Sequence, residues 1–198
     1  MKTTFGPQRM LFPLPTVLVV TGNMTKANII TIAWITMHTG KSPTLGIAVG
    51  TRGYSGEQIR ANMNFTVNIA TVDIMKEADF CGITSGREVD KFKATGFTKL
   101  PSTYIESPII KECPVNLECR LVESNMVGPT NHFVGEILET HIDTDHLGDQ
   151  HDPGTLDIRA VNPLIYYSGV REYWSLGEKV GDAYEIGKGL TISGHHSR

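Results

Sequence analysis

The segment VGTRGYS, residues 49–55, combines the residue types that hold a phosphate. It follows a β-branched run and precedes a stretch with helical signals, so free backbone N–H groups and the helix dipole favour an anion there. Its glycines allow close approach, its hydroxyls can donate hydrogen bonds, and its arginine can fork onto phosphate oxygens. The alternative is an ordinary capped turn with a solvated arginine. The candidate phosphate-binding residues are Gly50, Thr51, Arg52 and Ser55.

Other combinations of reactive side chains are weaker. The glycine spacing in this segment matches neither a dinucleotide-binding G-x-G-x-x-G nor a Walker loop. Histidines and carboxylates are dense between His141 and Asp152, which raises the possibility of zinc or iron. That spacing also suits a polar connection between strands, and we favour this interpretation over a metal site. Since no Ser-His-Asp or Cys-His arrangement can be argued, we expect no catalytic side chain.

Composition excludes several classes of protein. The chain has 198 residues, 40% of them hydrophobic and 20% charged, so it can bury a substantial core. A net charge of −3 without a basic stripe argues against nucleic-acid binding. Three cysteines without a C-x-x-C pair favour a reducing compartment, and Pro13 and Pro15 interrupt the N-terminal apolar run. We therefore expect a cytoplasmic protein that does not enter a membrane.

The elements that must position the phosphate segment are mostly strands. β-Branched and alternating runs predict strands, and capping boxes at Ser55 and Ser85, with Asp73 as a further cap, predict short helices. The expected strands are residues 16–21, 28–37, 44–49, 65–71, 115–121, 133–142 and 156–167. The expected helices are residues 55–63 and 74–80 and a third that stops at Gly96. This pattern predicts a mainly β protein with short helices, built as a small barrel in one domain over residues 1–198, with a surface tail from about residue 181.

A set of ordered segments carries a family resemblance. These segments are PTVLVVTG, NIITIAW, VGTRGYS, NFTVNIA, SGREVDKF, NHFVGEI and NPLIYYSGVREYWSLGE, spread over about residues 10–180. In that order the chain resembles the flavin reductase-like split-barrel proteins that bind flavin mononucleotide (FMN), and within them the flavoredoxins. The resemblance implies a Greek-key split β-barrel that dimerises, with FMN near the subunit interface.

The resemblance also implies roles for single residues. Four residues of the second strand would border the isoalloxazine ring: Asn28, Thr31, Ala33 and Trp34. Thr51, Arg52 and Ser55 would hold the phosphate, although the family often has threonine where Ser55 stands. Lys91 would add positive charge, His132 would lie by the flavin, and either Tyr166 or Tyr167 would sit against the ring.

Three functions remain open from the sequence. The first is an electron-transfer flavoprotein of the flavoredoxin kind that keeps FMN bound and exchanges electrons with a partner protein. The second is a flavin reductase in which NAD(P)H reduces the flavin. The third is a non-catalytic split barrel that holds haem or another ligand. We expect a homodimer in each case.

Overall fold

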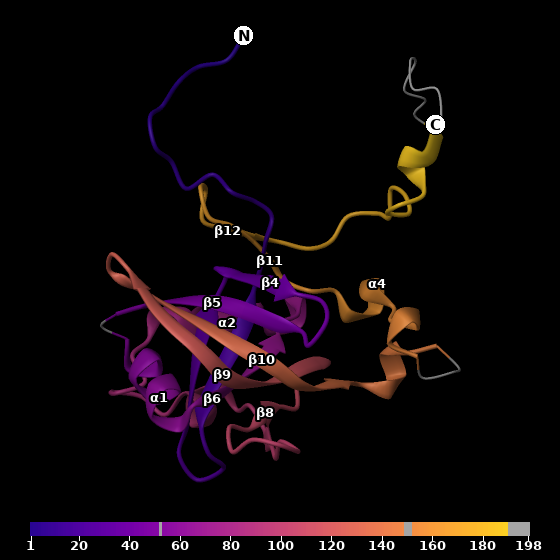
Figure 1. The fold of residues 1–198 in the computed structure, drawn as a ribbon. Coiled ribbons are helices and arrows are strands. Elements are labelled where there is room, and N and C mark those ends of the chain that lie inside the picture. The colour runs from indigo at the N-terminus through magenta and orange to yellow at the C-terminus, as the bar shows by residue number, and fades with distance from the viewer. Residues whose placement is uncertain (52, 149–151, 190–198) are drawn as a thin grey trace.

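The computed structural model describes residues 1–51, 53–148 and 152–189, and it is built around one seven-stranded antiparallel sheet (Figure 1). The strand order is β3-β2-β6-β9-β10-β5-β4. The strands are β2 (Val17–Gly22), β3 (Ala27–Ile32), β4 (Ile35–Thr39), β5 (Thr44–Gly50), β6 (Asn64–Ile69), β9 (Val115–Val127) and β10 (Thr130–Ile142). The predicted mainly β fold with short helices is confirmed.

The two edges of this sheet belong to one segment of the chain. β3 and β4 are separated only by Ala33 and Trp34, and the Ala48 N–H donates to the Trp34 carbonyl at 2.9 Å. The sheet therefore curls until its first and last strands adjoin. The single strand expected over residues 28–37 is wrong in this respect, because the chain bends at the link to pass from one edge of the sheet to the other.

β2 shows why its sequence is apolar throughout. Every residue of the strand is buried, because alternate side chains face two different cores. Val17 and Val19 point into the barrel, where they join residues such as Phe65 and Phe133. Leu18 and Val20 point outward and pack under the helices. A strand covered on both faces needs no polar alternation.

Three helices cover the outer face near β2 and β3. They are α1 (Tyr54–Asn62), α2 (Met75–Ile83), which follows the 3₁₀ turn η1 (Val72–Ile74), and α3 (Lys91–Thr95). The caps predicted at Ser55, Asp73 and Ser85 are wrong. α1 has Gly53 at its N-cap position and α2 has Ile74, neither with a capping side chain, while α3 is capped by Asp90, which accepts from the Lys93 N–H. Ser55 is turned inward instead and has a different partner.

The C-terminal part is more broken than predicted. The strand expected over 156–167 is wrong: a helix, α4 (Ile158–Val161), precedes β11 (Ile165–Tyr167). The Asp157 carboxylate caps α4 by accepting from two backbone N–H groups, and this local bond outweighs the apolar pattern. β11 pairs with β1 (Leu14–Pro15) and β12 (Glu172–Trp174).

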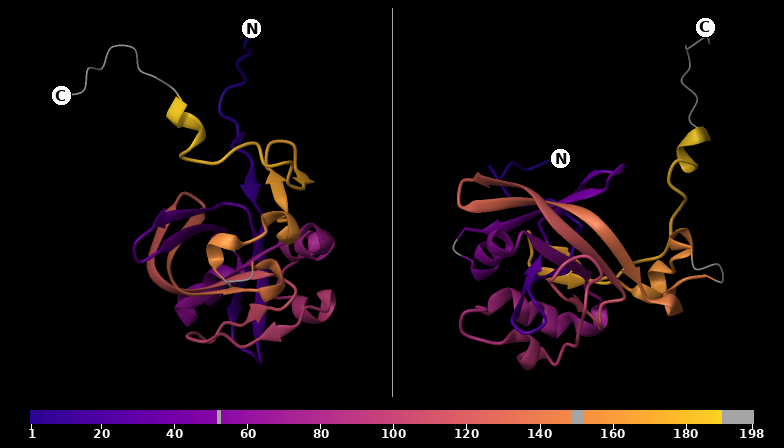
Figure 2. Two further views of the ribbon diagram at one scale, coloured as in Figure 1. Left: turned by 90° about the vertical axis from the view of Figure 1, so that its right-hand side faces the viewer. Right: turned by 60° about the horizontal axis from the view of Figure 1, so that its bottom comes forward.

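The remaining elements are short, and the N-terminal residues and the described part of the C-terminal segment, up to residue 189, run away from the barrel (Figure 2). They are β7 (Lys99–Leu100), β8 (Ile109–Ile110), and the 3₁₀ turns η2 (Thr144–His146), η3 (Pro153–Thr155) and η4 (Ile186–Gly189). Within the described parts of the chain, every helix is too short or too polar to cross a lipid bilayer.

Candidate functional site

Two adjoining cavities follow β3 where α2 packs beside it. One has a volume of about 440 Å³ and the other about 290 Å³, and they share Gly82 and Ile83. We call the first the aromatic cavity and the second the polar cavity, and together the β3 groove. The aromatic cavity includes Thr16, Thr31, Trp34, Asp79, Tyr166 and Tyr173. The polar cavity includes Ser55, Cys81, Ser85, Gly86, Arg87 and Lys91.

Lys91 is a buried cation at the polar cavity. Only 3% of the residue is exposed, and its Nζ donates to the carbonyl oxygens of Ile29 and Cys81, each at 2.7 Å. No carboxylate among the described residues forms an ion pair with it. Burial lowers the pKa of Lys91, which is the expected cost of a desolvated ammonium. An anion in the cavity would supply the missing negative charge and use the third ammonium hydrogen.

Ser55 lines the polar cavity, whereas Asn28, predicted to border the ring, lines neither part of the groove and lies behind Ser55. Ser55 is 3% exposed, and its Oγ accepts from Asn28 Nδ2 at 2.8 Å. Asn28 Oδ1 is buried without a hydrogen-bond partner in the described structure. Gly86 lies so close to Asn28 that a Cβ on it would be 1.8 Å from Asn28 Oδ1, so only glycine fits at this position. Asn28 therefore orients the serine at the start of α1, where backbone N–H groups and the helix dipole favour an anion.

The loop between α2 and α3 adds a second cation, Arg87. Its guanidinium pairs with Glu57 and lies over the Tyr54 ring, 5.1 Å from the ring centroid. Ser85 Oγ accepts from the Arg87 N–H at 3.3 Å, which tightens the turn. The segment SGREVDKF contains Arg87, but the resemblance assigned a role only to Lys91. The position of the arginine directly after the SG pair was the feature of the sequence that could have indicated a second cation.

The predicted phosphate segment is only partly at this cavity. Ser55 lines it, whereas Gly50 and Thr51 line neither part of the groove. The Thr51 N–H donates to the Pro129 carbonyl at 3.0 Å, so the turn is tied to the β9–β10 connection. Arg52 lies outside the described residues.

The aromatic cavity collects residues from β3, α2 and the C-terminal strands. Thr31, Ala33 and Trp34 line it, and their contact with a flavin ring stays a prediction. The Thr31 hydroxyl donates to the Ala78 carbonyl, which holds α2 against β3. Thr16 also lines it, and its buried Oγ1 has no partner among the described residues. A polar atom left free at a cavity wall is available to a polar ligand edge.

Tyr166 and Tyr167 point to opposite faces of β11, and only one of them faces the aromatic cavity. Tyr166 lines the aromatic cavity, whereas Tyr167 faces the other way and stacks on Phe12 at 5.1 Å between centroids. Tyr173 of β12 also lines the cavity, and its hydroxyl donates to Asp79 Oδ1 at 3.0 Å. Burial and the neighbouring Asp79 carboxylate raise the pKa of Tyr173, so its phenol stays protonated. Sequence reasoning missed both partners, because 94 residues separate them.

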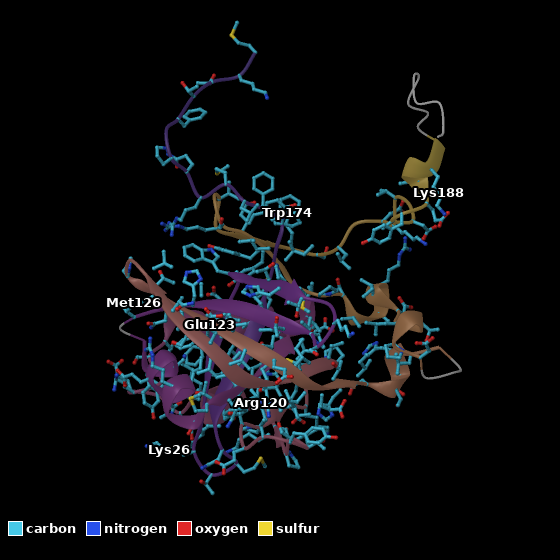
Figure 3. All side chains as sticks on the ribbon, in the orientation of Figure 1. Lys26, Arg120, Glu123, Met126, Trp174 and Lys188 are labelled. Carbon is cyan, nitrogen blue, oxygen red and sulfur yellow. The ribbon has the colours of Figure 1, made fainter. Side chains whose placement is uncertain are left out.

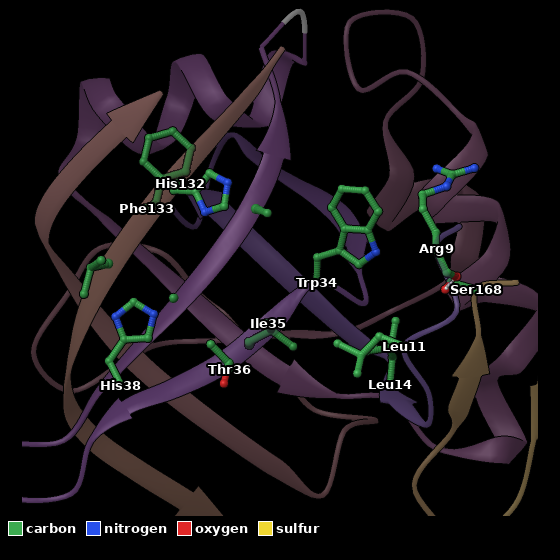
Figure 4. A pocket seen from close by; sticks show the side chains of 13 residues that line it. Arg9, Leu11, Leu14, Trp34, Ile35, Thr36, His38, His132, Phe133 and Ser168 are labelled. Carbon is green, nitrogen blue, oxygen red and sulfur yellow. Dashed lines mark hydrogen bonds between the residues drawn. The ribbon is translucent and has the colours of Figure 1, made fainter. Parts of the chain in front are cut away.

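His132 does not line the β3 groove. It lines a third cavity, of about 400 Å³, which shares Trp34 and Ala48 with the aromatic cavity (Figure 4). The residue is therefore a neighbour of the groove, separated from it by those two side chains.

The histidine- and carboxylate-rich stretch offers no metal site among its described residues. His141 Nε2 lies 2.7 Å from Oε1 of the buried Glu118, and no group of three histidine, cysteine or carboxylate residues in the described part of the chain could hold a metal. Asp149 and His151 lie outside the described residues. Burial raises the pKa of Cys81 to about 11, so this thiol at the polar cavity stays protonated and a poor nucleophile.

Comparison with known proteins gives the family. A family model, the flavin reductase like domain, matches residues 9–175. The chain belongs to this family. A relative from Archaeoglobus fulgidus is 35% identical over 149 residues, which are 75% of this chain and 80% of the relative.

Solved structures agree with the split-barrel fold. The flavoredoxin of Desulfovibrio vulgaris (Miyazaki F) is 30% identical, with a TM-score of 0.87 over 95% of this chain and all of that one. The flavoredoxin from Methanosarcina acetivorans is also 30% identical, with a TM-score of 0.86 over 96% of this chain and all of that one. The predicted resemblance and the predicted split barrel are confirmed.

Proposed function

We propose that this protein binds FMN non-covalently in the β3 groove and transfers electrons through it, as a flavoredoxin-like flavoprotein. The observation that carries the proposal is Lys91, a buried cation that has no carboxylate partner among the described residues. It lies at one end of a groove whose other end is aromatic. A planar ligand with an anionic tail complements both ends. The similarity to two flavoredoxins supports a flavin as the cofactor.

The residues at the polar cavity suit a phosphate. Lys91 would neutralise it, and Ser55 and the start of α1 would donate hydrogen bonds to it. Gly86 lacks a Cβ, so Asn28 can lie against the loop and hold the Ser55 hydroxyl in place. FMN ends in a phosphate that fills this position, which is why we propose FMN and not the dinucleotide FAD.

The residues at the aromatic cavity suit a flavin ring. Tyr166 and Trp34 would pack against it, and Thr16 Oγ1 would hydrogen-bond its polar edge. When bound, the isoalloxazine supplies the chemistry, since it takes up electrons singly or as a hydride. The chain's own contribution is to orient the ring, to exclude water from it and to set its potential through Arg171 and Asp79, which also line the cavity. None of these roles needs a side-chain acid or base.

The electron donor separates this function from its main alternative. A flavin reductase would accept a hydride from NAD(P)H, and the cavity next to the groove at His132 leaves room for a nicotinamide. The experiment is to mix the purified protein with NADH and NADPH and to follow the flavin absorbance. Unchanged absorbance, followed by bleaching with a reduced partner protein, supports electron transfer. Rapid bleaching with either nucleotide supports the reductase.

The cofactor itself is tested by the absorption spectrum and by the mass of the released ligand. A flavin spectrum and the mass of FMN support the proposal. A Soret band would instead indicate a haem-binding module. A colourless protein that does not take up added FMN would overturn the proposal.

We further propose that the protein is a homodimer. The far end of the β9–β10 hairpin presents Val122, Met126 and Val127, and Met126 is 69% exposed (Figure 3). Large apolar side chains that stay exposed on one hairpin favour a protein interface. Sedimentation of the wild type and of Met126→Lys should give a dimer and a monomer respectively. A monomeric wild type would contradict this.

A further inference from the structure

The cavity at His132 lies on the outer face of β4, β5 and β10, and we call it the outer cavity (Figure 4). Its volume of about 400 Å³ is within the range of about 300–1,000 Å³ typical of small-molecule sites. None of its lining residues belongs to the polar cavity. It is therefore a separate space and not a continuation of the phosphate end of the groove.

Small residues form the floor of the outer cavity and leave room for the imidazole of His38. The register between β4 and β5 shifts between Met37 and Thr39, and a shift of this kind re-aims the side chain at its centre, here His38. The imidazole lies over Gly46, where a Cβ would be only 2.3 Å from His38 Nε2. Gly46 and Ala48 thus form a nearly flat floor beneath the ring.

The walls are apolar, and the polar groups stand at the two ends. Trp34, Leu11 and Leu14 form the apolar part, and the Trp34 indole is 44% exposed. Figure 4 shows Arg9 at one end and the imidazoles of His38 and His132 at the other. The Ser168 hydroxyl donates to the Arg9 carbonyl at 2.8 Å and so anchors the segment that carries the arginine.

The charge pattern identifies the ligand class. No aspartate or glutamate lines the outer cavity, and Arg9 has no ion-pair partner in the described part of the chain. The Arg9 guanidinium favours a carboxylate, the flat apolar middle favours a planar ring, and two imidazoles favour a hydrogen-bonding group at the far end of that ring. An inorganic anion or a metal ion would leave the apolar walls without a partner.

We propose that the outer cavity binds a small aromatic carboxylate that carries a hydroxyl or carbonyl group opposite its acid. Arg9 holds the carboxylate, Trp34 packs on the ring, and His38 and His132 hydrogen-bond the opposite group. The proposal goes beyond the flavin function and does not require it. Because Trp34 and Ala48 also line the aromatic cavity, a ligand here would lie beside a flavin bound in the groove.

The test is calorimetric titration of the full-length protein, with and without FMN, using 4-hydroxybenzoate as the probe. Two related compounds each lack one feature: 4-hydroxybenzamide lacks the charge and benzoate lacks the hydroxyl. We expect 4-hydroxybenzoate to bind at least roughly tenfold more tightly than either, since each comparison removes a hydrogen bond or a charge contact. Cyclohexanecarboxylate, which is not planar, should bind more weakly than benzoate.

Matched variants assign each end of the cavity. Arg9→Ala should remove the preference for the acid over the amide, and Lys2→Ala, in the same N-terminal segment, should keep it. His38→Ala with His132→Ala should remove the preference for the hydroxyl compound over benzoate. The unfolding temperature should stay at the wild-type value in all of them, which shows that the fold persists, and the FMN content should stay unchanged in Arg9→Ala and Lys2→Ala.

The outcomes separate this proposal from the flavin function. FMN binding without 4-hydroxybenzoate binding overturns the proposal alone, and this includes the case in which a second copy of the chain covers the cavity. Binding of NADH but not of the carboxylate overturns it in favour of a nicotinamide site. Carboxylate binding that survives in the Arg9 and histidine variants also overturns it. Carboxylate binding without FMN binding upholds it while the flavin function fails.

Discussion

The two ends of the β3 groove are built in different ways. The polar cavity uses residues at the starts of α1 and α3 and the loop before α3, and its central groups, Lys91 and Ser55, are almost fully buried and hydrogen-bonded. The aromatic cavity uses segments from both halves of the chain, and a side-chain bond between Tyr173 and Asp79 links two of them. The first end is rigid and defined by charge, whereas the second depends on how the C-terminal strands dock. The anion should therefore dominate cofactor affinity, and the ring contacts should adjust it.

Replacing the buried cation should have the largest effect. Lys91→Met should weaken FMN binding by about 10- to 150-fold, because a hydrogen bond to a charged group contributes about 1.5–3 kcal/mol. Lys93→Met is the control, since Lys93 is exposed on the same helix. Fluorescence titration of the FMN-free protein measures both. Equal affinities for FMN would show that the anion does not sit at Lys91.

Crowding the polar cavity should have the second largest effect. Gly86→Ala would press a Cβ onto Asn28 Oδ1, so the loop or Asn28 must shift. We expect a loss of about 1–3 kcal/mol in the free energy of unfolding, with weaker FMN binding as Ser55 loses its partner. Gly40→Ala is the control because its Cβ would meet nothing within 4 Å. Urea denaturation compares the two variants. Equal stabilities would show that Asn28 and the loop shift without cost to accommodate the Cβ.

The tyrosine pair tests the aromatic end. Tyr166→Ala should weaken FMN binding by about 0.5–1.5 kcal/mol, the typical contribution of an aromatic contact. Tyr167→Ala should leave that affinity unchanged, because its ring stacks on Phe12 outside the groove. The same titration distinguishes them. A larger loss from Tyr167→Ala would mean that β11 presents its other face to the flavin.

The link between Tyr173 and Asp79 should give the smallest effect. Tyr173→Phe should weaken FMN binding about threefold or less, since one partly exposed hydrogen bond contributes about 0.5 kcal/mol. The raised pKa of Tyr173 means that its stabilising contribution is present at neutral pH and is lost only as the pH rises above the ordinary tyrosine value and through the raised one. Ultraviolet titration of the phenol should show late ionisation in the wild type. Asp79→Asn should move this ionisation toward lower pH, and an unmoved ionisation would contradict the assigned bond.

Features set by local sequence could be predicted, whereas features that depend on contacts between distant segments could not. Local patterns were enough for β2, β5 and β6, because strand periodicity defines these elements. Lys91 was named through the family resemblance and Ser55 through the phosphate-like segment, and their role in binding stays a prediction. Local patterns were not enough for the bend at Ala33–Trp34, where closure of the barrel splits one apolar run into two strands. They also missed Asp79, Tyr173 and Thr16, whose roles arise only when distant segments meet at the aromatic cavity.

The short link at Ala33–Trp34 also protects the barrel from unwanted strand pairing. An open seven-stranded sheet would leave two rows of backbone amides and carbonyls free to recruit a strand from another molecule, the usual start of β-aggregation. Here both rows belong to neighbouring stretches of one segment, and the two-residue link keeps β3 and β4 next to each other where they meet. Lengthening the link by a few residues should therefore expose an unpaired strand edge without unfolding the core. We expect such insertion variants to precipitate while their secondary structure is still intact.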